Sequence, residues 1–70
     1  MKFSDKVFYL RQKNKLTQVE LAERTNVKQS TIQAYESGRA KPMYNTMVAL
    51  ANALGVSAED LVDETKTISE

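Results

Sequence analysis

The sequence predicts an all-α fold of five short helices in a single domain. Its 70 residues are enough for one small core, and 41% of them are hydrophobic, which is too high for a disordered chain. Apolar residues recur at the spacing of one helix face, and strand-like alternation is absent. Only two glycines and one proline interrupt this pattern.

The first two helices are expected on either side of a short break. Ser4 or Asp5 can cap the first helix, which then runs to about Asn14 with its apolar residues on one face. Thr17 and Glu20 have the spacing of a capping box, in which the hydroxyl and the carboxylate each satisfy a backbone amide. We therefore expect the second helix to begin directly after Thr17.

The third expected helix follows the second after a very short connection. Asn26 can adopt the left-handed conformation that ends a helix, so the second helix stops near Thr25. Apolar spacing then predicts a helix from Gln29 to Ser37, with Gly38 closing it. A connection of about three residues is too short for antiparallel stacking, so the two helices must cross steeply.

Two further helices and a tail complete the expected chain. Apolar spacing predicts a fourth helix from Tyr44 to Leu54, which a glycine ends. Ser57 and Asp60 can cap a short fifth helix reciprocally. We place the folded domain at residues 1–63 and a flexible C-terminal tail at residues 64–70.

The composition argues against several kinds of protein. Without cysteine or histidine, the chain has no disulfide, no thiol nucleophile and none of the commonest metal ligands or general bases. Its acidic pairs have no catalytic partners, so we expect no enzyme, no cofactor and no bound metal. No apolar run is long enough to span a membrane, and the N-terminus lacks the apolar region of a signal peptide. A cytoplasmic protein is therefore expected.

Charge is distributed unevenly along the chain, although the net charge is only +1. Residues 1–41 carry nine basic and four acidic side chains, whereas residues 42–70 carry one basic and five acidic side chains. Such asymmetry is typical of a protein with one pole facing phosphate. Ordinary solvated surface gives the same pattern, so charge alone leaves both interpretations open.

Several short motifs occur together in one order and at fixed spacing. They are Leu10-Arg11, Leu16 to Glu23, Gln29 to Ile32, Tyr35 to Gly38, Pro42, Leu50-Ala51 and Ala53 to Ser57. In this arrangement the chain resembles the Cro/repressor helix-turn-helix family, which includes many phage repressors. The resemblance implies a lambda-repressor-like DNA-binding domain of five helices, with the helix-turn-helix formed by the second and third.

The resemblance also implies that the third helix enters the major groove and that its N-terminal residues read bases. The residues that would contact bases are Lys28, Gln29, Ser30, Gln33 and Ala34. Their chemistry fits independently, because Gln29 can bond adenine through two hydrogen bonds and Ala34 can touch a thymine methyl group. The alternative is that they are solvated residues of an amphipathic helix.

Residues at the edges of the groove would contact phosphates. They are Gln18, Ser37, Arg39, Lys41, Tyr44 and Asn45. Gln18 begins a helix, where backbone amides and the helix dipole favour an anion, whereas Arg39 and Lys41 could also belong to a solvated loop. The family commonly pairs the positions of Arg11 and Glu36, so these two are expected to form a structural ion pair.

Three residues depart from the pattern of the family. Asn26 stands where the turn usually carries glycine, and asparagine is the best other residue there. Lys28 opens the third helix where serine or threonine is common, and it has no side-chain oxygen for capping. Met43 follows the proline where serine is common. These departures concern local caps and not the fold.

We therefore expect a sequence-specific double-stranded DNA-binding transcriptional regulator, with repression as the favoured action. A protein-binding module of the same fold, such as a regulator's antagonist or an antitoxin partner, is the alternative. The outward face of the third helix distinguishes the two, because a protein binder would expose large apolar residues there. The polar outward residues of this helix favour the DNA reader, and they are Gln29, Ser30, Gln33 and Ser37.

The expected partners are a palindromic DNA operator and a second copy of the chain. A single module of this size buries only roughly 600–1,000 Å² on DNA, and family members usually bind as two-fold dimers. The acidic C-terminal region is the expected dimer surface. Its apolar candidates are Val56, Leu61, Val62 and Ile68, although Val56 and Leu61 could instead be core. No small-molecule ligand is expected.

Overall fold

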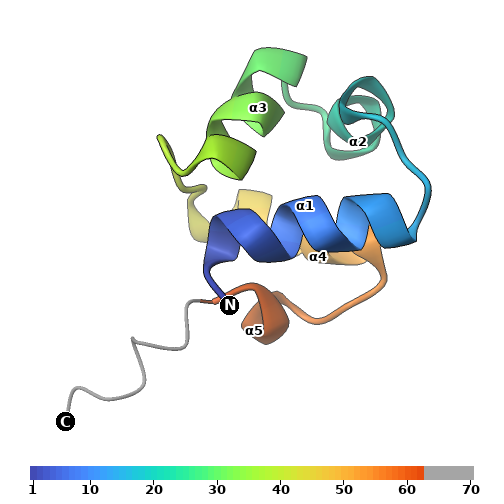
Figure 1. The fold of residues 1–70 in the computed structure, drawn as a ribbon. Helices are drawn as coiled ribbons and strands as arrows, with labels where there is room; N and C mark the ends of the chain where they lie inside the picture. Colours follow the sequence, from blue (N-terminus) through green and yellow to red (C-terminus); the bar gives the residue numbers. More distant parts are fainter. Residues whose placement is uncertain (63–70) are drawn as a thin grey trace, which may run out of the picture.

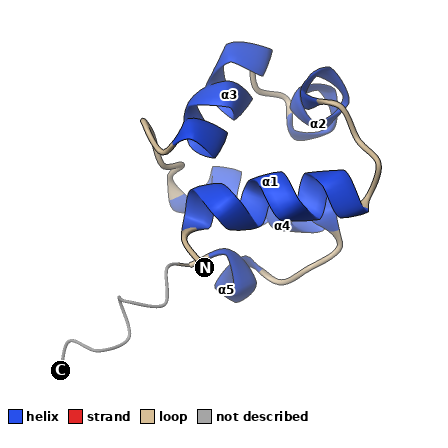
Figure 2. Cartoon of the chain, in the orientation of Figure 1, coloured by secondary structure: helices blue, strands red, loops and turns tan. Residues whose placement is uncertain are grey.

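Five helices make up the part of the chain that the structure, a computed structural model, describes, namely residues 1–62. They are α1 (Phe3–Lys13), α2 (Gln18–Thr25), α3 (Gln29–Ser37), α4 (Tyr44–Leu54) and α5 (Ala58–Leu61). No strand occurs among these residues (Figure 2). The expected all-α class with five helices is confirmed. The expected tail at residues 64–70 lies outside the described residues.

The helices surround one apolar core. α1 crosses the middle of the molecule, with α2 and α3 on one side of it and α5 on the other (Figure 1). α3 packs on both α1 and α2, and α4 packs on α2 and α5. The buried apolar residues of the core are Phe3, Val7, Leu16, Leu21, Ala22, Ile32, Tyr35, Leu50, Ala51, Leu54 and Leu61.

The first helix begins earlier than expected. α1 starts at Phe3 with Lys2 in the capping position, and no side chain caps it, so the expectation that Ser4 or Asp5 would do so is wrong. Burial decides this start, because the Phe3 side chain is 2% exposed and its ring meets that of Tyr35 edge-on, with 5.9 Å between centroids. Carrying the helix back to Phe3 points this ring into the core.

The second helix begins as the sequence predicts. The Thr17 amide donates to the Glu20 carboxylate at 2.8 Å, and the Glu20 amide donates to the Thr17 hydroxyl at 3.0 Å. This reciprocal capping box satisfies two amides that the helix itself leaves without partners. It fixes the start of α2, and with it the position of the next residue, Gln18.

Left-handed residues end three of the helices. Asn26 closes α2 with φ of 61°, and glycines close α3 and α4. The amide of Val27 then bonds back to the carbonyl of Ala22 at 3.1 Å, which is the pattern of a Schellman motif. Asparagine tolerates this backbone better than other residues with a side chain, so the missing glycine leaves the turn intact.

The C-terminal end of the domain is more deeply buried than expected. Leu61 is fully buried in the core, so the structure selects its core role and excludes it from a dimer surface. Val56 packs against the core but stays half-buried. The chain reaches α5 with the Asp60 carboxylate accepting from both the amide and the hydroxyl of Ser57. This cap turns Leu61 inward. Val62 stays at the surface, and Ile68 lies outside the described residues.

Candidate nucleic-acid interface

The helix-turn-helix places one face of α3 in the core and the opposite face in solvent. Three residues, from Asn26 to Lys28, connect α2 to α3. Ile32 and Tyr35 anchor α3 from its inner face, where they are 0% and 6% exposed. Ala22 lies buried in the same core on α2, where a small side chain allows close approach of the helices. The outer face of α3 is therefore held at a fixed angle.

The predicted base-reading residues share this outer face. Lys28, Gln29, Ser30 and Gln33 are exposed, whereas Ala34 is half-buried. Lys28 precedes α3 without a side-chain cap, as expected from its lack of a side-chain oxygen. The exposed set offers hydrogen-bond donors and acceptors and no large apolar group, which suits the polar edges of base pairs.

Five of the predicted phosphate contacts form a second group. It runs from the last residue of α3, through the connection to α4, to the first two residues of α4. Ser37, Arg39, Lys41, Tyr44 and Asn45 are all exposed. Arg39 donates through Nε to the Ser37 hydroxyl at 3.0 Å, which joins two residues of this group. These residues lie in or follow the end of α3 along the chain, and their exposed side chains can all form hydrogen bonds with an anion.

Gln18 stands apart from that second group, at the start of α2. Its side chain is half-buried, and the structure brings it to Gln29 on α3. The two are joined by a hydrogen bond of 3.2 Å from Gln29 Nε2 to Gln18 Oε1. A predicted phosphate contact and a predicted base contact are therefore coupled directly.

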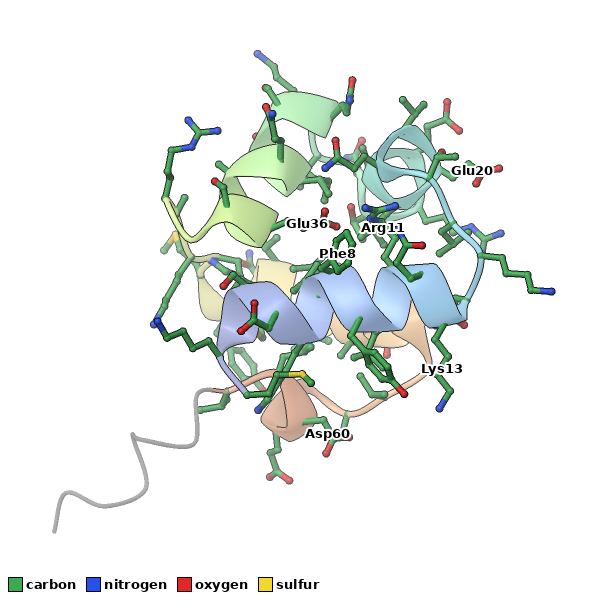
Figure 3. The ribbon with its side chains drawn as sticks, in the orientation of Figure 1. Phe8, Arg11, Lys13, Glu20, Glu36 and Asp60 are labelled. Carbon is green, nitrogen blue, oxygen red and sulfur yellow. The ribbon has the colours of Figure 1, made fainter. Side chains whose placement is uncertain are left out.

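Arg11 on α1 and Glu36 on α3 form a buried ion pair behind this coupling. Arg11 Nε lies 2.5 Å from Glu36 Oε2, and Nη2 donates to Oε1 at 3.0 Å. The two side chains are 9% and 7% exposed. Arg11 Nη1 also donates to the Leu16 carbonyl at 2.9 Å, so the guanidinium binds α3 and the loop before α2 together. Figure 3 shows the pair between α1 and α3.

The ion pair extends to the glutamines through one further contact. Gln18 Nε2 donates to Glu36 Oε1 at 3.1 Å, so a continuous chain of hydrogen bonds runs from Arg11 through Glu36 and Gln18 to Gln29. Its inner end is buried and its outer end is exposed. The sequence did not predict this connection.

Phe8 is a residue of this site that the sequence analysis missed. Its half-exposed ring lies over the Arg11 guanidinium, with Cζ 5.4 Å from the ring centroid. A cation over an aromatic face is attracted by the ring quadrupole. The spacing of three residues on one helix was the available signal, because such residues are neighbours on the helix surface.

Hydrogen bonding to Glu36 raises the pKa of Arg11 above its ordinary value, against the opposing effect of burial. The guanidinium therefore stays charged at any pH at which the protein would be studied. Burial raises the pKa of Tyr35 as well, which keeps its phenol neutral within the core.

Other kinds of site find no support within residues 1–62. This part of the chain has no group of three or more acidic, histidine or cysteine side chains placed to hold a metal ion. None of its helices is both long and apolar enough to cross a membrane.

Comparison with known proteins relates the chain to transcriptional regulators. The profile of a helix-turn-helix family matches residues 7–61. The immunity repressor of Bacillus phage phi105 is 36% identical over 70 residues, which are all of this chain and 49% of that protein. The transcriptional repressor RstR of a cryptic phage CTXphi from Vibrio cholerae is 37% identical over 65 residues, 93% of this chain and 59% of that protein.

A solved structure agrees with the fold. The P22 c2 repressor in complex with a synthetic operator superposes with a TM-score of 0.86, over 89% of this chain and 94% of that chain. At 24% identity this likeness concerns the fold alone.

The phage phi105 relative is about twice as long as the matched region, so the present chain spans about half of its length.

Replacing Arg11 tests whether the ion pair holds the helices together. We expect Arg11→Met to lower the free energy of unfolding by about 3–5 kcal/mol, because it leaves the Glu36 carboxylate buried without a counter-charge. Methionine keeps much of the apolar stem, so the loss reflects the charge. The measurement is urea unfolding followed by circular dichroism.

Arg24→Met is the matched control, because Arg24 is exposed on α2. It should change the free energy of unfolding by no more than about 0.5 kcal/mol. Equal effects of the two substitutions would contradict a structural role for the pair.

Proposed function

This chain belongs to the helix-turn-helix family, and from that membership we propose that it is a sequence-specific, double-stranded DNA-binding transcriptional regulator that acts as a repressor. The names of its relatives, an immunity repressor and a phage transcriptional repressor, support repression. The observation that carries the proposal is the polar outer face of α3, held at a fixed angle by buried Ile32 and Tyr35. The proposed activity is binding alone, in the cytoplasm, without a cofactor.

Base reading is assigned to the outer face of α3. Gln29 Oε1 and one Nε2–H match the N6 donor and the N7 acceptor of adenine in the major groove. Ser30 and Gln33 can each donate or accept, and Lys28 can reach guanine or a phosphate. Ala34 is half-buried, so only its methyl group would meet a thymine methyl group.

Phosphate binding is assigned to both sides of α3. The amides at the start of α2, with Gln18, would hold one phosphate at the positive end of a helix. Ser37, Arg39 and Lys41, together with Tyr44 and Asn45 at the start of α4, would hold the backbone on the other side. Phosphate contacts on both sides of α3 would determine how deeply this helix enters the groove.

A protein-binding role of the same fold has weaker support. A surface that binds a protein partner typically exposes large apolar residues. The described outer face of α3 carries amides, a hydroxyl and an ammonium group instead. The favoured ligand is therefore DNA.

Dimerisation on a palindromic operator is the second part of the proposal. A single module buries too little surface for tight specific binding, so two copies would occupy half-sites about one helical turn apart. Because Leu61 is fully buried, the described candidates of that region with surface are the exposed Val62 and the half-buried Val56. So small an apolar contact favours a dimer that forms on DNA and not in free solution.

Salt dependence tests the phosphate contacts. The logarithm of the binding constant should fall with the logarithm of salt concentration, with a slope of about −0.9 per phosphate neutralised. Arg39→Gln should flatten this slope by about one unit and weaken binding to every duplex alike. Lys13→Gln is the control of equal charge, because Lys13 leaves the end of α1 away from α3 (Figure 3). Identical slopes for the two variants would remove Arg39 from the interface.

Base preference tests the assignment of Gln29. Gln29→Ala should cost about 1–3 kcal/mol of binding free energy on the preferred site and relax the preference at one base pair. Stability should hardly change, because Gln29 is exposed. Binding to a panel of single-base operator variants measures both effects. The exposed Gln12 of α1 supplies the control Gln12→Ala, which should leave the preference profile unchanged; an unchanged profile for Gln29→Ala would refute the assignment.

Analytical ultracentrifugation tests the assembly. At micromolar concentration the free protein should sediment as a monomer, and a palindromic duplex should bind two copies cooperatively, because the second copy gains a contact with the first. A duplex with a single half-site should bind one copy more weakly. Saturation of the palindrome by one copy would contradict the dimer.

A further inference from the structure

We infer that the Arg11–Glu36 ion pair determines which atoms of the Gln29 amide face the DNA, and that Glu36 is thereby a positioning residue for base preference. The inference rests on the proposed function, since it assigns a cause to the base that Gln29 prefers. It starts from the chain of hydrogen bonds that runs from Arg11 through Glu36 and Gln18 to Gln29.

The direction of this chain follows from the chemistry of a carboxylate. An ionised carboxylate can only accept hydrogen bonds, so Gln18 must turn its NH₂ group towards Glu36, and it does so at 3.1 Å. The Gln18 carbonyl oxygen then lies at the other edge of the amide. It can only accept, so Gln29 must turn its own NH₂ group towards Gln18, at 3.2 Å. Each amide therefore has one allowed orientation.

Glu36 itself cannot turn away from this arrangement. Arg11 holds both of its oxygens, through Nε on Oε2 and Nη2 on Oε1. The third nitrogen of Arg11 is held by the Leu16 carbonyl, and the Phe8 ring covers the guanidinium. The pair is buried and satisfied, so orientation is imposed from the core outwards to the exposed Gln29.

The consequence for recognition lies in what Gln29 has left to offer. With one N–H engaged by Gln18, Gln29 presents its carbonyl oxygen and its second N–H to solvent. That pair complements the N6 donor and N7 acceptor of adenine. A free glutamine amide can turn over and offer its NH₂ group to guanine O6 and N7 instead. Fixing the amide therefore selects adenine over guanine through a residue that does not touch DNA.

The test compares three variants by the ratio of affinities for operators with adenine and with guanine opposite Gln29. Glu36→Gln replaces the acceptor-only group with one that can also donate. Gln18→Met removes the connecting amide and leaves the ion pair in place. We expect each to lower the adenine preference by roughly tenfold, within the range of about 5-fold to 150-fold that a two-hydrogen-bond contact contributes. Circular dichroism establishes that each variant is folded.

Glu20→Gln is the matched control, with the same chemical change on α2. It removes one negative charge and weakens the capping box, but Glu20 takes no part in the chain of hydrogen bonds to Gln29. It should therefore leave the adenine-to-guanine ratio unchanged. A general change in charge would instead affect Glu20→Gln and Glu36→Gln alike, and Gln18→Met leaves the buried ion pair in place, so it separates the effect of orientation from a loss of stability.

A second measurement needs no DNA. In the free protein, the Gln29 side-chain NH₂ resonances should shift in Glu36→Gln and in Gln18→Met, and should stay in place in Glu20→Gln. If the wild-type chain binds no duplex, or Gln29→Ala alters no preference, the proposed function fails while these resonances still report on the orientation. Folded Gln18→Met protein with the wild-type ratio and unshifted resonances would overturn the inference, whether or not Glu36→Gln folds.

Discussion

The ion pair between Arg11 and Glu36 is the interaction on which the position of α3 depends. It joins α1 to α3, and through the Leu16 carbonyl it also holds the loop that leads into α2. Two charges removed from water are costly unless their remaining hydrogen-bonding groups are satisfied. Here Glu36 also accepts from Gln18, and Phe8 covers the guanidinium, so the environment compensates the cost that burial imposes.

Packing of the apolar core holds the helices together and so keeps water away from this ion pair. The edge-on contact of Phe3 with Tyr35 and the fully buried Ile32 hold α1 against α3. Full burial of one such side chain contributes about 1.5–3 kcal/mol. A domain of this size has few such residues, so it commits nearly all of them, Leu61 included. That commitment explains why so little apolar surface is left in the C-terminal region for a partner.

Charge is distributed so that the helix-turn-helix segment is basic and the segment after it is acidic. Nine of the ten basic residues lie in residues 1–41, where only four of the nine acidic residues occur, so the segment that contains the helix-turn-helix is the positive one. The described acidic residues of α5 lie across α1 from α2 and α3 (Figure 1). In the proposed function, phosphate would attract one end of such a molecule and repel the other, which would orient α3 before any base contact forms.

Local chemistry in the sequence was enough to determine α2, α3 and α4. Thr17 and Glu20 fixed the start of α2, Asn26 fixed its end, and the predicted bounds of α3 and α4 agree with those observed. These features depend on residues within one turn of each other, so they can be read without knowing the fold. The outward position of Gln29 also followed, because the spacing of Ile32 and Tyr35 determines which face of α3 is buried.

Only the tertiary structure decided the features that join distant residues. The start of α1 at Phe3 depended on a contact with Tyr35, and the burial of Leu61 depended on room in a core built from other helices. The chain of hydrogen bonds from Glu36 through Gln18 to Gln29 required three side chains from two helices to meet within 3.1 and 3.2 Å. Sequence spacing specifies distance along one helix, whereas these contacts depend on the angle at which two helices cross, and that angle is set by packing of the whole core.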